Sequence, residues 1–120
     1  MFRALKKLFG KWEPKEGVLY RSKSAGYERR LGYSVDIITE CYINGSWAPC
    51  SFMLKKGEYH IFLSKNKRLV IEKKYVKVRK VKIESGVGEV WLRNGAHFGA
   101  PILEIHYQLT VLDSSKLKSQ

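Results

Sequence analysis

The residues whose side chains could do chemistry are few and spread along the chain. Cys41 and Cys50 are separated by eight residues, and no further Cys or His pair completes a four-ligand zinc site. A tight turn between the two cysteines would set them opposite each other, where thiols can bridge. A reducing cytosol would keep them as thiols. The sequence therefore predicts no metal site and leaves a disulfide between Cys41 and Cys50 open.

The other reactive residues show no catalytic pattern. His60, His97 and His106 sit in or beside expected strands, which is typical of structural histidines with satisfied partners. The acidic residues are scattered singly, with no pair placed by sequence for acid–base work. Gly86-Val87-Gly88 is too short for a phosphate-binding loop and is interpreted as a turn. These features predict a protein that is not an enzyme and needs no cofactor, although a site assembled only in three dimensions stays open.

Positive charge is the dominant feature of the composition. The chain of 120 residues has 23 Lys and Arg against 11 Asp and Glu, a formal net charge of +12. The stretch at 65–82, KNKRLVIEKKYVKVRKVK, holds nine of these cations and a single acid, Glu72. Such a surface attracts polyanions, so nucleic acid, an anionic membrane or an acidic protein is the expected partner. The alternative is that the charge serves solubility alone.

Basic residues interleaved with aromatics favour nucleic acid, because cations neutralise phosphates while aromatic faces stack on unpaired bases. Contacts to phosphates carry no base information, so we expect binding with little sequence preference to DNA or RNA. We expect Trp47 and Trp91 to lie in the core. The predicted nucleic-acid-binding residues are Arg29, Arg30, Lys73, Lys74, Tyr75, Lys77, Arg79, Lys80 and Lys82.

The N-terminal segment supports a second hypothesis. MFRALKKLFGKW carries Phe2, Leu5, Phe9 and Trp12 at helical spacing, with basic residues mostly on the remaining arc. A basic amphipathic helix over 1–14 could lie in a membrane interface, giving peripheral association with anionic membranes together with the 65–82 face. The same helix could instead cap one end of a β core.

From Gly17 onward the hydrophobic period is two, which predicts strands. Short segments rich in Val, Ile, Tyr and Phe, separated by turn residues, predict an all-β fold: an antiparallel β-sandwich or small barrel of about seven to eight strands. We expect one domain over 17–112, a basic loop at 22–32 and a frayed polar tail at 113–120. The expected strands are 18–20, 33–43, 51–54, 59–64, 68–71, 75–84, 87–93 and 102–112.

Three local features can be placed within these strands. A turn centred on Gly45-Ser46 sets Cys41 opposite Cys50, with Asn44-Gly45 supplying residues that tolerate positive φ. A second hairpin turn is expected at 93–96, with a return strand interrupted at 99–101. Along 75–83 the apolar residues change parity, which predicts a bulge near Arg79-Lys80. Such a bulge would turn the basic residues Lys77, Arg79, Lys80 and Lys82 outward together.

The segment from Tyr33 to Leu92 resembles the PEGA and carboxypeptidase-regulatory, transthyretin-like β-sandwich modules. The resemblance rests on YINGSW at 42–47, FMLKKGEYHIFL at 52–63 and VKIESG at 81–86. It implies that Gly57 makes a tight turn and that Tyr59 and Ile61 point into the core. It also implies a non-enzymatic adhesive or spacer module and assigns no functional residues. A weaker resemblance to PH-like lipid-binding domains rests on NKRLVIEKKYVKVRKVKI, although the tail DSSKLKSQ is too short for their closing helix.

The remaining expectations concern setting and partner. No run of eighteen apolar residues and no secretory signal pattern is present, so we expect a cytoplasmic protein. Plentiful Lys, Glu, Ile and Val with few glutamines lean toward a thermophilic source. A third hypothesis is a structural or protein-interaction module, viral or from a mobile element, that attracts an acidic protein partner.

Overall fold

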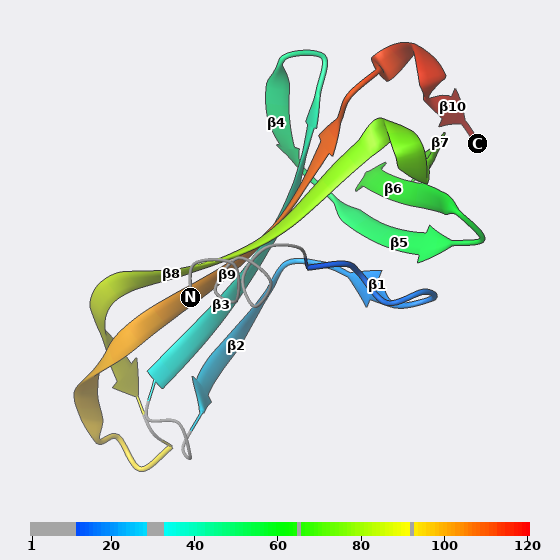
Figure 1. Ribbon diagram of the computed structural model, residues 1–120. Coiled ribbons are helices and arrows are strands. Elements are labelled where there is room, and N and C mark those ends of the chain that lie inside the picture. The colour runs from blue at the N-terminus through cyan, green and yellow to red at the C-terminus, as the bar shows by residue number, and fades with distance from the viewer. Residues whose placement is uncertain (1–11, 29–32, 65, 92) are drawn as a thin grey trace.

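A computed structural model describes residues 12–28, 33–64, 66–91 and 93–120, and these residues form two β-sheets (Figure 1). The expected all-β class is therefore confirmed. The predicted helix over 1–14 falls almost entirely outside the described residues.

Sheet A is antiparallel, with strand order β1-β5-β6-β7-β10. Its hairpins are short: β5 and β6 are joined by Lys56 and Gly57, whose φ angles of 51° and 77° are those of a tight two-residue turn. The Gly57 turn expected from the resemblance is thus present. The strands are β1 (Leu19–Tyr20), β5 (Ser51–Lys55), β6 (Glu58–Ser64), β7 (Lys67–Glu72) and β10 (Lys118–Ser119).

Sheet B is mixed, with order β2-β3-β9-β8 and with β4 also paired to β3. The expectation of purely antiparallel sheets is wrong, because β3 and β9 run parallel, from Ser34 beside Ile102 to Tyr42 beside Thr110. The chain leaves β3, builds β4 to β8, and returns through a hairpin beside the strand that it left. The strands are β2 (Lys23–Glu28), β3 (Tyr33–Ile43), β4 (Ser46–Pro49), β8 (Val76–Trp91) and β9 (His97–Val111).

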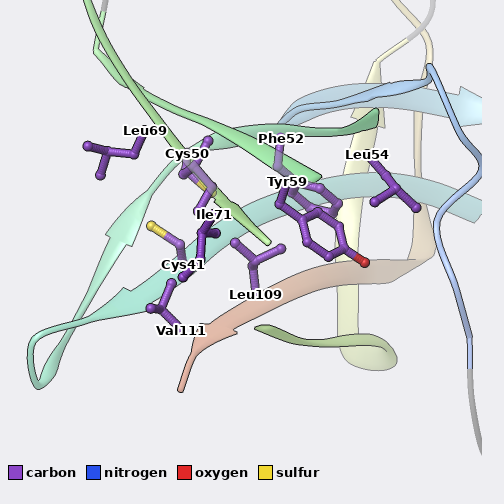
Figure 2. Packing of buried hydrophobic residues seen from close by; sticks show 10 residues of the cluster. Cys41, Cys50, Phe52, Leu54, Tyr59, Leu69, Ile71, Leu109 and Val111 are labelled. Atoms are coloured by element: carbon purple, nitrogen blue, oxygen red, sulfur yellow. The ribbon is translucent and has the colours of Figure 1, made fainter. Parts of the chain in front are cut away.

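The hydrophobic core lies between sheet A and one end of sheet B (Figure 2). Phe52 and Ile61 from sheet A, and Cys41 and Leu109 from sheet B, are fully buried. Tyr59 and Ile61 point into this core, as expected. We call sheet A, together with the ends of β3, β8 and β9 that it covers (39–43, 76–80 and 107–111), the sandwich.

Sheet B continues well past the sandwich as a long twisted extension (Figure 1). We call this extension the arm: β2 with residues 33–37 of β3, 82–91 of β8 and 97–105 of β9. The radius of gyration, 17.0 Å, exceeds the ~14 Å typical of a compact domain of this length. The elongation reflects strands that are longer than the sheet that covers them.

Several local predictions need correction. Residues 23–28, expected in a loop, form β2, and residues 76–84 and 87–91, expected in two separate strands, lie in the single strand β8. The bulge in β8 lies between Glu84 and Val87, where Gly86 has a φ of 101°. It does not lie at Arg79-Lys80. Likewise, 99–101 stay paired within β9 and do not interrupt it.

The C-terminal tail is also more ordered than expected. A 3-10 turn, η2 (Ser114–Lys116), is capped by Asp113, whose side chain accepts a hydrogen bond from the Ser115 N–H. The Ser115 hydroxyl also donates to this carboxylate, at 2.6 Å, and that bond together with the N–H bond holds the pKa of the Asp113 carboxyl below its usual value. β10 then pairs with β7, and the Gln120 N–H donates to the Arg68 carbonyl at 2.9 Å. The tail therefore closes the edge of sheet A and is not frayed.

Candidate nucleic-acid interface

The basic stretch at 65–82 passes from one sheet to the other. Its first part is β7 in sheet A, a 3-10 turn η1 (Lys73–Tyr75) follows, and its last part begins β8 in sheet B. Register along β8 is regular from Val76 to Glu84. Since successive side chains of a regular strand point to opposite faces, Lys77 and Arg79 lie on the outer face, while Lys80 and Lys82 share the face of Val76 and Val78. The predicted single row of four cations is wrong.

Four of the predicted residues nevertheless line one hollow of about 860 Å³, beside the edge strand β8. Its apolar wall includes Val76 and Val78, and Glu13 is the carboxylate among the described residues that line it. Lys77 and Arg79 border the hollow from the outer face of β8, whereas its apolar and aromatic lining lies on the core side of the same edge strand. Cations beside aromatic rings suit an anion that also carries flat groups. The basic lining residues are Lys73, Lys74, Lys77 and Arg79, and the aromatic ones are Trp12 and Tyr59.

Trp12 is held against the sandwich by other aromatic rings. Its ring centroid lies 5.3 Å from that of Tyr20 and 5.1 Å from that of Tyr107. The Lys80 ammonium lies over the same cluster, 6.0 Å from the Trp12 ring and 5.8 Å from the Tyr107 ring. Trp12 therefore contributes to the fold. The other predicted membrane residues, Phe2, Leu5 and Phe9, lie outside the described residues, as do Arg29 and Arg30.

The Tyr75 ring already has several contacts within the protein. The ammonium groups of Lys74 and Lys116 lie 5.2 Å and 5.6 Å from its ring centroid, and its half-buried ring packs against the core. Lys74 also pairs with Glu72 at 3.6 Å. This arrangement leaves the Tyr75 ring less suited to base stacking than the sequence suggested, while Lys73, Lys77 and Arg79 keep exposed side chains.

The expectation that Trp47 is a core residue is wrong. Trp47 lies on β4 with 47% of its surface exposed, and its ring packs against that of Tyr42, at 5.1 Å between centroids. Trp47 pairs with Tyr42, which lies on the face of sheet B opposite to the buried Cys41 and so away from sheet A. Sequence reasoning therefore missed an exposed Trp that packs against a Tyr. The side chain of Trp91 is outside the part of the protein that the structure describes, so its place in the core stays a prediction.

The prediction for the two cysteines has the hairpin turn nearly at the correct position, but the register between the two strands is wrong. The turn residues are Asn44 and Gly45, at φ 53° and 84°, so Cys41 pairs with Ala48 and not with Cys50. Both cysteines are buried free thiols in the structure. A hydrogen bond to the Cys41 sulfur and burial together raise the pKa of the Cys50 thiol. A disulfide between them stays a prediction.

On the outer face of sheet B, His106 lies between two carboxylates. One ring nitrogen is 3.3 Å from Glu104 Oε1 and the other is 3.9 Å from Glu40 Oε1. The Gln108 amide reaches the same Glu40 oxygen at 3.5 Å. His106 is thus a structural histidine with partners, as expected. Among the described residues, no group of three His, Cys, Asp or Glu side chains is placed to hold a metal ion.

Comparison of the chain with protein-family models, curated proteins and solved structures returns no match. The resemblance to PEGA and transthyretin-like modules therefore stays a prediction. In the part of the chain that the structure describes, no helix is long and apolar enough to cross a membrane.

Proposed function

We propose that the protein is a non-enzymatic module that binds nucleic acid with little sequence preference, using the basic hollow beside β8. The observation that carries the proposal is that Lys73, Lys74, Lys77 and Arg79 meet around one hollow with a single carboxylate, Glu13, among the described lining residues. Phosphates that replace the counterions of these cations would supply the affinity.

Direct binding measurements test this proposal. We expect labelled single- and double-stranded DNA and RNA to bind with log K falling steeply and linearly as log salt rises. The double charge reversal Lys77→Glu with Arg79→Glu should weaken binding and lower the slope by about two on duplex DNA. The matched control is Lys55→Glu with Lys67→Glu, two exposed residues of sheet A that do not line the hollow.

The same experiment separates the alternatives. Anionic and neutral liposomes are run in parallel, with a variant lacking residues 1–11 that keeps Trp12 in its aromatic cluster. Binding to anionic liposomes alone, lost in the truncated variant, would replace the proposal with peripheral membrane association. Binding to neither ligand would overturn both proposals and favour an acidic protein partner or charge that serves solubility. Equal losses in the reversal and in its control would overturn the assignment to the hollow.

A further inference from the structure

The aromatic pair on the β3–β4 hairpin, the exposed Trp47 and the half-buried Tyr42, does not line the hollow. Trp47 and Tyr42 are direct cross-strand neighbours, and such a pair can stabilise a hairpin through the contact between its rings. Stabilising the hairpin does not explain why nearly half of the Trp47 surface faces solvent. Isolated exposed apolar residues are ordinary, so the neighbours of this pair decide whether it has a further use.

The sheet register places this pair in line with the cations of the hollow. Trp47 pairs with Tyr42, Tyr42 lies beside Thr110, and Thr110 pairs with Lys77, so the four residues form one row across β4, β3, β9 and β8. Paired residues share a face of the sheet. With strands spaced about 4.8 Å apart, the row extends about 14 Å from the aromatic ring to the cation. The Lys77 end of this row is part of the lining of the hollow.

Acidic residues limit where an anion can lie on this face. The next row contains Glu40, Gln108 and Arg79, and the row after it contains His106, with Glu104 beyond. The carboxylates of Glu40 and Glu104 would repel phosphates placed farther toward the arm. A polyanion held at Lys77 and Arg79 is therefore directed along the end row, toward Tyr42 and Trp47.

We propose that Trp47, supported by Tyr42, is a base-stacking site that makes the protein prefer single-stranded nucleic acid. The inference rests on the proposed function and goes beyond it by naming the ligand class. Every base has a π-face, so stacking tolerates any sequence, whereas a duplex keeps its bases stacked on each other and unavailable to the side chain. Phosphates would lie at Lys77 and Arg79, and an unpaired base would lie on the exposed indole.

The test uses the full chain, with a fluorescent twelve-nucleotide oligothymidylate and a twelve-base-pair duplex as probes. Trp47→Leu keeps apolar bulk but removes the aromatic face, and Trp47→Phe keeps a smaller aromatic face. We expect Trp47→Leu to weaken oligothymidylate binding by about 5- to 150-fold, which is the range that stacking of one base gives. Duplex binding should change less than about twofold and the salt slope should stay the same, because no phosphate contact is lost. Trp47→Phe should retain most of the affinity.

Controls keep this inference separate from the proposed function. Leu112→Ala removes an exposed apolar side chain, 62% accessible, that is not in the row. Circular dichroism checks that each variant is folded. If Trp47→Leu binds oligothymidylate as wild type does, while Lys77→Glu with Arg79→Glu loses affinity, the stacking site is wrong and the proposed function stands. Equal losses on oligothymidylate and duplex would also overturn stacking. If the wild-type protein binds neither probe, both proposals fail.

Discussion

The sandwich and the arm share three strands, β3, β8 and β9, and differ in what lies over them. One face of sheet B carries Cys41 and Leu109 in the sandwich, where sheet A covers both completely. Farther along the same face, in the arm, Ile37 and Ile105 are only half-buried. Alternation of apolar and polar residues continues through both regions. It predicts a strand and a shared face, but it does not reveal whether another layer covers that face.

Strand length accounts for the difference. β8 and β9 have 16 and 15 residues, whereas β5, β6 and β7 have between five and seven. At about 3.3 Å per residue the long strands extend roughly 50 Å and the short ones roughly 20 Å. Sheet A can therefore bury only one end of sheet B. The stability of the protein should be concentrated there, and the arm should tolerate changes that the sandwich does not.

The largest difference is expected from truncating a core side chain. Phe52 is fully buried in the sandwich, so Phe52→Ala should lower the free energy of unfolding by about 3–5 kcal/mol. Val87 is 75% exposed in the arm, so Val87→Ala should change it by less than about 0.5 kcal/mol. Urea unfolding followed by circular dichroism measures both. A comparable loss in Val87→Ala would mean that the arm is covered in solution, for instance by a second copy of the chain.

A pH-dependent difference should come from the buried phenol of the sandwich. Burial raises the pKa of Tyr59 to about 12, above the value near 10 of an unfolded chain. Above pH 10 the unfolded state releases this proton first, so the stability that Tyr59 contributes is complete below pH 10 and is lost as pH rises toward 12. The total loss is about 2–3 kcal/mol.

Unfolding of wild type and Tyr59→Phe at several pH values isolates this effect, because other titrating groups are common to both proteins. We expect the stability of wild type relative to Tyr59→Phe to be constant from pH 7 to 9 and to fall between pH 10 and 12. A constant difference throughout would show that the hydroxyl reaches water in the folded state.

Within the arm, close packing at a glycine should have a smaller and more local effect. Gly88 pairs with Ala100, and a Cβ at position 88 would overlap the Ile102 side chain. We expect Gly88→Ala to cost about 1–2 kcal/mol and to speed amide hydrogen exchange in the arm, with protection in the sandwich unchanged. Adding Ile102→Ala removes the overlapping atoms and should restore part of the protection. Faster exchange throughout the protein would show that arm and sandwich unfold as one unit.

A loss at the lower end of this range should come from the edge of sheet A. Deleting residues 118–120 removes β10, the backbone hydrogen bond to Arg68 and the Arg68 Nη2 contact with Gln120 Oε1 at 2.7 Å. Since this edge is exposed, we expect a loss of about 1 kcal/mol in the free energy of unfolding. An unchanged midpoint in urea would support the frayed tail that its polar sequence suggests.

Local features of this fold could be predicted because a few adjacent residues determine them. Asn44-Gly45 and Gly57 mark two hairpin turns, and the limits of β3 match the alternating run at 33–43. The parallel pairing of β3 with β9 could not be predicted, because parallel and antiparallel neighbours show similar residue patterns at this length. The bulge was predicted at the wrong position because Val81 and Ile83 were expected to be buried, yet Ile83 is 41% exposed.

The basic residues of the candidate interface could be predicted from the sequence, but the shape of the hollow could not. Lys73, Lys77 and Arg79 were identified from charge alone, but the hollow also needs Trp12 and Tyr59, which come from other parts of the chain. Trp47 was missed because apolar aromatics are assigned to cores by default. Its side chain lies on the face of sheet B that sheet A does not cover, and the short sequence of β4 does not show which face that is.

The central position of β9 has a consequence for the order in which the protein can assemble during synthesis. β9 lies between β3 and β8, and it pairs Ser34 with Ile102, residues far apart in the sequence. Domains rich in such distant pairings fold slowly, because a long loop must close before the contacts form. While the ribosome is still making residues 97–111, one edge of β3 has no partner. An unpaired strand edge invites association between nascent chains. Repulsion between the dense positive charges at 65–82, which are translated before β9, would oppose that association until the last long strand arrives.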